Sequence, residues 1–140
     1  MKTKYLLVAI FCSMIVLVSG CRSSPVQNVE KHAYDANIAN YTQEDVKKAI
    51  KRAGTGLGWI ISDEEPGHAV GTLYLRDHMA KVDINYDLEG YSITYKDSSN
   101  LDYESTGEGS TDGTGATIHS NYNGWVQNLD NSIRTQLGNL

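Results

Sequence analysis

The feature that most constrains the fold is an alternation of apolar and polar residues between positions 68 and 96. It is clearest over Met79–Tyr86, where every second residue lies on one apolar side: Ala80, Val82, Ile84 and Tyr86. The same alternation covers His68–Arg76 and Tyr91–Lys96. A repeat of two residues is typical of half-buried strands, and the short turns between the segments indicate antiparallel pairing. We therefore expect a sheet with one apolar and one polar face, and Tyr74 is the best candidate for an aromatic ring on the polar face.

Two segments carry the repeat of an amphipathic helix. In Thr42–Ala53 the apolar residues recur at steps of three and four: Val46, Ala49, Ile50 and Ala53. Thr42 is a suitable N-cap, and Gly54 is expected to end this helix. From Ile118 the same spacing continues for about 20 residues through Tyr122, Trp125, Val126, Leu129, Ile133 and Leu137. Gly124 is expected to let this second helix lie close to the sheet.

The segment Leu57–Ser62, which contains Trp59, is the remaining strand candidate. A sheet with one apolar face needs a cover, and both helices have an apolar stripe. The expected fold class is α+β, a two-layer sandwich in which two helices cover one face of a four-stranded antiparallel meander (α-β-β-β-β-α). The chain has 140 residues, which is enough for one domain, and we place that domain at residues 37–140.

Two polar segments lack a regular repeat. Residues 21–36 contain Pro25 and are interpreted as a tether, with a strand or short helix packed on the domain as the alternative. Residues 97–117 are rich in Gly and acidic residues and are expected to form a mobile loop. The acidic residues of this loop lack the spacing of an EF-hand, so a solvated loop is favoured over a weak cation site.

The N-terminus has the pattern of a secretory signal peptide, which we assign to residues 1–20. Lys2 and Lys4 precede Tyr5–Val18, an apolar run of 14 residues. A spanning helix needs about 20 apolar residues, so a permanent transmembrane segment is the weaker interpretation. The run ends in Val18-Ser19-Gly20-Cys21, which resembles a bacterial lipobox, with a chance cysteine as the alternative.

The lipobox resemblance implies that Cys21 is the lipid-attachment residue and becomes the first residue after cleavage. It also implies a membrane partner through acyl chains on Cys21. Arg22, rather than Asp, follows the cysteine, and in Gram-negative bacteria this implies the outer membrane with the domain facing the periplasm. Cys12 is removed with the signal peptide, so the mature chain has no thiol available as a nucleophile.

Composition and motifs argue against several classes of protein. The net charge of −5 argues against a nucleic-acid partner, because phosphate binding needs a basic face. The sequence has no GxSxG, Walker A or HExxH motif. Its four histidines are not spaced as a metal-binding pair on a helix. We expect no catalytic residues, no cofactor and no metal.

Four short motifs carry a family resemblance: RDHMAKVDINY (76–86), YSITY (91–95), SNLDY (99–103) and IHSNYNGWV (118–126). Together they resemble a family of small, functionally uncharacterised lipoproteins of Gram-negative bacteria, over about residues 40–137. The resemblance implies an envelope location and brings no known activity.

Some polar residues within these motifs have no evident structural role. They form our candidate binding set: Arg76, His78, Asn100, His119 and Asn123. His119 lies at the start of the last helix, beside the loop that Asn100 begins. Either His119 and Asn100 cap the backbone of the helix and loop, which is favoured, or they form a small polar site.

The leading functional hypothesis is a non-enzymatic outer-membrane lipoprotein that binds an envelope protein or helps to maintain the envelope. The alternative is a module that binds glycan or peptidoglycan, since the chain has nine tyrosines and two tryptophans and aromatic rings stack on sugars. An exposed row of aromatic side chains would favour the glycan-binding alternative. An enzyme is the third class considered.

Overall fold

The computed structural model describes residues 22–34, 41–105 and 115–140. These residues form an α+β fold with two helices and antiparallel sheets, which confirms the expected class at this level. The elements are β1 (Ser23–Pro25), β2 (Val29–Ala33), α2 (Gln43–Gly56), β3 (Ile60–Glu65), β4 (His68–Leu75), β5 (His78–Tyr86), β6 (Gly90–Ser99), β7 (Glu104–Ser105), β8 (Ala116–His119) and α3 (Asn121–Leu137). No helix in these ranges is long and apolar enough to span a membrane.

The large sheet has five strands in the order β2-β6-β5-β4-β3, so the prediction of four strands was wrong. The expected meander is present as β3 to β6, and β2 adds a fifth strand along β6, with Val29 opposite Ile93. The sequence of β2, VEKHA, is nearly all exposed and has no apolar repeat by which it could be recognised. Gly90 permits this pairing, because a Cβ at that position would collide with the carbonyl of His32.

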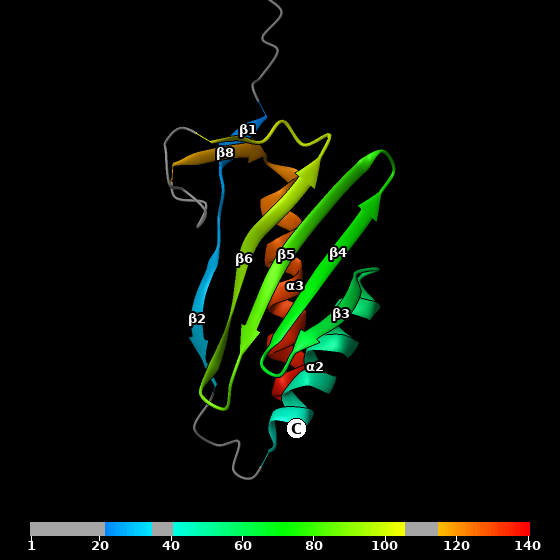
Figure 1. Cartoon of the computed structure of the whole chain (residues 1–140), viewed down its shortest axis with the longest axis vertical. Coiled ribbons are helices and arrows are strands. Elements are labelled where there is room, and N and C mark those ends of the chain that lie inside the picture. Colours follow the sequence, from blue (N-terminus) through cyan, green and yellow to red (C-terminus); the bar gives the residue numbers. More distant parts are fainter. Residues whose placement is uncertain (1–21, 35–40, 106–114) are drawn as a thin grey trace, which may run out of the picture.

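A second sheet, β1-β8-β7, lies at one end of the molecule (Figure 1). The tether prediction is therefore wrong for residues 22–34, and the alternative of strands packed on the domain is correct. Residues 21, 35 and 36 of the predicted tether lie outside the described ranges. β1 has only three residues, which is too few for an alternating pattern to be visible.

The predicted loop at 97–117 is wrong at both of its ends. Residues 97–99 extend β6, residues 104–105 form β7, and residues 116–119 form β8. Residues 106–114, the middle of the predicted loop, lie outside the described residues.

α2 begins as predicted, with Thr42 as its N-cap. The backbone N–H of Asp45 donates to the Thr42 hydroxyl at 3.3 Å, and the Thr42 N–H donates to the Asp45 carboxylate at 2.8 Å, forming a capping box. The C-terminal end differs from the prediction, because the helix continues past Gly54 and the left-handed residue is Gly58, at φ 84°. Gly54 is instead buried against Ile61.

α3 buries most of the predicted apolar stripe: Tyr122, Val126, Leu129, Ile133 and Leu137. It begins later than expected, because Ile118 belongs to β8, and Trp125 is only half-buried against the core. Gly124 is exposed with open space where a Cβ would be, so the expectation that it brings the helix close to the sheet was wrong.

The core lies between the large sheet and the two helices, which cover the same face (Figure 1). The alternating residues Ala80, Val82, Ile84 and Ile93 are fully buried there, and Trp59 joins them. The helices also contact each other, since the Ser132 hydroxyl donates to the Ala53 carbonyl at 3.3 Å.

One buried polar link joins α3 to the large sheet. Asp130 is only 5% exposed although it is charged. The Tyr91 hydroxyl donates to one of its carboxylate oxygens at 2.6 Å, and Arg134 lies 2.9 Å from the other. Burial, together with the hydrogen bond to Asp130, raises the pKa of Tyr91 far above its ordinary value. Tyr91 is therefore a neutral donor that helps to compensate the desolvation of Asp130.

We predict that Tyr91→Phe lowers the free energy of unfolding by about 1–3 kcal/mol, because it leaves a buried carboxylate with one donor fewer. Urea denaturation measures the loss, and a double-mutant cycle with Asp130→Asn isolates the coupling. Stability equal to that of the wild type would contradict the compensating role of this hydrogen bond.

A second prediction compares two helical glycines. Gly54→Ala should destabilise the domain by about 1–3 kcal/mol, because the added methyl would lie 2.5 Å from two carbon atoms of Ile61. Gly124→Ala should stabilise it by about 0.5–1 kcal/mol, because the site is open and Ala loses less backbone entropy in a helix. Thermal unfolding of both variants checks the two signs, and equal shifts would contradict the described packing.

Candidate functional site

Three of the five candidate binding residues meet at the end of the domain that carries the small sheet. His78 opens β5, Asn100 follows β6, and His119 ends β8 immediately before α3. Figure 1 shows these element ends together at the top of the view. The site is therefore built from segments about 20 residues apart along the chain, brought together by the meander and the small sheet.

His78 is held by the backbone of the segment after β6. Its Nδ1 lies 2.6 Å from the Asn100 carbonyl oxygen, so Nδ1 carries the proton and donates. In the neutral ring this leaves the lone pair on Nε2. Asn100 adopts a positive φ of 58°, a conformation that asparagine tolerates, and its amide donates to the Asp77 carbonyl at 3.4 Å. Both residues thus tie the β4–β5 turn to the segment after β6.

His119 caps the N-terminal end of α3. Its backbone N–H donates to the Leu101 carbonyl at 2.8 Å, and its Nδ1 accepts from the backbone N–H of Asn121 at 3.2 Å. Ser120, the formal N-cap, makes no side-chain capping bond. The neutral ring therefore carries its proton on Nε2, and the capping interpretation of His119 is confirmed.

The histidine cluster, defined as His78, His119 and Trp125, combines these rings. The two imidazoles are stacked with centroids 6.3 Å apart, and the Trp125 ring lies 6.3 Å from His78 at a tilt of 47°. Trp125 was missed as a site residue, because its place on the apolar stripe assigned it to the core. The sequence signal that could have identified Trp125 is its position one turn after the start of α3.

The other two candidate residues do not join the cluster. The Asn123 amide donates to the Ser24 hydroxyl at 3.0 Å and to the Pro25 carbonyl at 2.8 Å, and its Oδ1 accepts from the Gln27 N–H at 3.0 Å. Asn123 is therefore a clamp on the N-terminal segment. Arg76 is exposed in the β4–β5 turn, where it adopts a φ of 55°.

The chemistry available to the histidine cluster is that of hydrogen bonding and ring contact. In the neutral state one imidazole presents a lone pair and the other an N–H, beside an indole face. Over residues 22–34, 41–105 and 115–140, no group of three or more His, Cys, Asp or Glu residues is placed to hold a metal ion. Cys21 lies outside these ranges.

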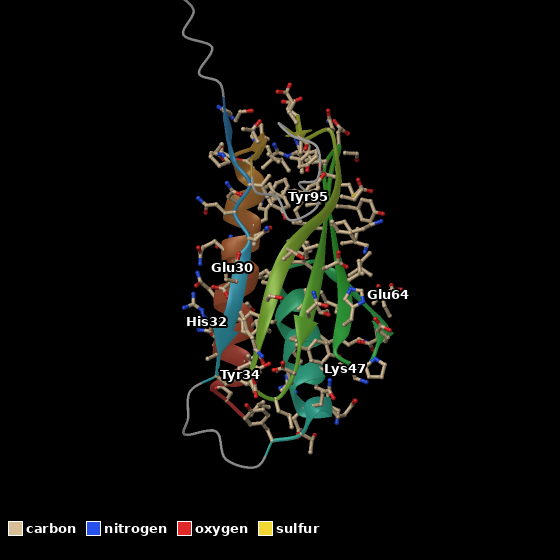
Figure 2. The ribbon with its side chains drawn as sticks, turned by 60° about the vertical axis from the view of Figure 1, so that its left-hand side comes forward. Glu30, His32, Tyr34, Lys47, Glu64 and Tyr95 are labelled. Atoms are coloured by element: carbon tan, nitrogen blue, oxygen red, sulfur yellow. The ribbon has the colours of Figure 1, made fainter. Side chains whose placement is uncertain are left out.

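A second feature, which sequence reasoning missed, is a hollow of about 570 Å³ beside the end of β6. The rings of Tyr95 and Tyr103 stack there almost in parallel, with centroids 4.2 Å apart, and Figure 2 labels Tyr95 in this region. Asp83 lines the hollow and lies 2.9 Å from the Lys96 ammonium and 2.7 Å from His68. Burial raises the pKa of Asp83, but hydrogen bonds from Lys96 and His68 outweigh burial and hold it below its usual value.

A second hollow, of about 450 Å³, lies where α2 approaches the β3–β4 turn. Lys47 and Glu64 line it, and Figure 2 shows both on this side of the domain. Its other charged residues are acidic: Glu44, Asp63 and Glu65. The candidate binding residues do not contribute to this hollow.

No protein-family model, curated protein or solved structure matches the chain. The proposed function is therefore drawn from the sequence and from the geometry of the described residues.

We predict that His119→Ala lowers the free energy of unfolding by about 1 kcal/mol, the usual cost of removing a helix cap. His119→Asn should restore part of the loss, because asparagine can also accept from a helix N–H. Urea denaturation of both variants checks this order. If the two variants are equally stable, His119 does not act as the cap of α3.

Proposed function

We propose that the protein is a lipoprotein, acylated at Cys21 and held in the outer membrane with its domain in the periplasm. We further propose that the domain is a non-enzymatic module that binds an envelope protein or helps to maintain the envelope. The anchor is supported by the signal-peptide pattern and by Val18-Ser19-Gly20-Cys21. Arg22 after the cysteine supports the outer membrane.

The observation that favours protein binding over glycan binding is the distribution of aromatic side chains. In the part of the chain that the structure describes, Tyr74, at 64% exposed, is the one tyrosine or tryptophan that is neither buried nor half-buried. Its exposure was predicted, but a single ring does not make the row on which a sugar chain would stack. The rings of Trp59, Tyr86, Tyr91 and Tyr122 are buried.

The open face of the large sheet offers an apolar contact for a protein partner. Ile60 is 61% exposed and pairs with Thr72, on the face opposite the core residue Ile61. Covering this side chain with a partner would remove apolar surface from water, which favours association. We assign the partner surface to this face, around Ile60.

The alternative, a glycan-binding module, is favoured by one specific feature. The stacked rings of Tyr95 and Tyr103 border the hollow beside β6, next to the polar residues Asp97, Ser98 and Asn100. Stacking of the two rings on each other covers one face of each, which reduces the surface available to a sugar. This alternative is therefore second.

We predict that Cys21→Ala blocks fatty-acid labelling and leaves an uncleaved precursor, because acylation of the thiol precedes cleavage in lipoproteins. Metabolic labelling with a fatty acid, followed by the mass of the N-terminal peptide, measures both effects. The control is Cys12→Ala, which removes the other cysteine and should be labelled normally. Labelling of the Cys21→Ala variant would contradict the anchor.

A crosslinking experiment separates the two binding functions. A photo-crosslinking residue at position 60, on the open sheet face, should capture an envelope protein in cells. The same residue at position 51, on the exposed side of α2, is the control and should not capture it. If position 60 captures nothing and the protein instead sediments with purified cell-wall sacculi, the glycan-binding alternative is correct.

A further inference from the structure

The N-terminal segment is attached to the domain from Arg22 onwards. The Arg22 carbonyl accepts from the backbone N–H of Ser120 at 2.7 Å, next to the start of α3. Ser23–Pro25 then pairs with β8, and the N–H of the buried Val26 donates to the Ala116 carbonyl at 3.0 Å. Asn123 holds the same segment from α3. These contacts fix the first described residues to one end of the domain.

The covalent distance from this end to the proposed anchor is one peptide unit. Cys21 directly precedes Arg22, and consecutive Cα atoms are about 3.8 Å apart. A lipoprotein domain can move away from its membrane only when a free segment separates it from the acylated residue. Because residues 22–26 are paired with the domain, such a segment is lacking between Cys21 and β1.

The same end of the molecule presents exposed apolar side chains. Figure 1 shows the β4–β5 turn at the end that carries β1 and β8, and the β5–β6 turn at the opposite end. At the end of β4, just before the former turn, Tyr74 is 64% and Leu75 45% exposed, and Arg76 follows them in the turn. Tyrosine, leucine and arginine side chains together suit the boundary between lipid head groups and acyl chains. The β5–β6 turn instead carries Asp87 and Glu89.

We propose that the end of the domain formed by β1, β8 and the β4–β5 turn lies against the bilayer, with Tyr74 and Leu75 in contact with lipid. This inference rests on the proposed function, because it takes Cys21 as the acylated residue. The occupant of this end is the membrane surface rather than a protein, because an anchor one residue away places lipid there in every copy. In this orientation the large sheet is perpendicular to the membrane plane. Its open face around Ile60 stays accessible to a partner.

Two single-cysteine variants of the lipidated, full mature protein test the orientation. Leu75→Cys places a thiol at the end of β4, next to the β4–β5 turn, and Leu88→Cys is the matched control, an exposed leucine in the opposite β5–β6 turn. Acylation consumes the thiol of Cys21, so a fluorophore labels the introduced cysteine alone. The labelled proteins are placed in vesicles of phosphatidylethanolamine and phosphatidylglycerol, with or without brominated acyl chains, which quench on contact.

The expected result is a loss of fluorescence at position 75 with brominated lipid and unchanged fluorescence at position 88. Equal quenching at both positions, or none at either, overturns the proposed orientation. Flotation of the same samples with the vesicles separates a failure of the lipid anchor from a failure of the orientation. Protein that does not float contradicts the lipid anchor itself, whereas protein that floats without quenching at position 75 contradicts only the orientation.

A comparison of vesicles with permeabilised cells tests whether a protein, rather than lipid, covers this end of the domain. With the membrane interpretation, the label at position 75 is quenched in vesicles that contain no other protein. If it is unquenched there, yet position 75 is protected from a water-soluble thiol reagent in permeabilised cells, an envelope protein covers this end and the membrane proposal is wrong.

Discussion

The pairing of the N-terminal segment with the C-terminal half of the chain connects the two sheets. β1 pairs with β8 in the small sheet, and β2 pairs with β6 in the large one, so one short segment is part of both. Asn123, in the first turn of α3, adds two hydrogen bonds to β1 and one to Gln27, which lies between β1 and β2. The position of α3, the end of the large sheet and the start of the domain are therefore set together. An anchored protein gains a defined orientation from this arrangement, because the chain is fixed to the domain immediately after the proposed anchor.

The parts of the fold that could be predicted are those stabilised by burial of apolar side chains. The alternation along β5 predicted which residues face the core, and Ala80, Val82 and Ile84 are fully buried. The N-cap of α2 was also predictable. The side chains of a threonine and of an acidic residue three positions later each accept a hydrogen bond from the other's backbone N–H. β1 and β2 carry no such signal. They are held by backbone pairing to strands that are distant in the sequence, and a hydropathy pattern does not report on that pairing.

The candidate site was predicted in part for a similar reason. His78, Asn100 and His119 were selected as polar residues of the four motifs that had no evident structural role, and the structure brings them together. Trp125 was overlooked because the helical repeat accounted for it as a core residue, although it is half-buried beside His78. Asn123 was selected for the same polarity but binds the N-terminal segment. Its partners, Ser24 and Pro25, belong to the segment that the sequence indicated as a tether.

The pairing of β1 with β8 also has a consequence for the order in which the protein matures. Ser23 lies opposite His119, so this contact joins the first and last parts of the described chain. Contacts between residues so distant in sequence form late, because a long loop must close first, whereas the meander β3–β6 consists of local contacts. Until the chain has emerged as far as β8, Arg22 has no partner strand beside it. If Cys21 is acylated as proposed, enzymes acting at that stage would meet a chain in which residues 23–25 have not yet paired with β8.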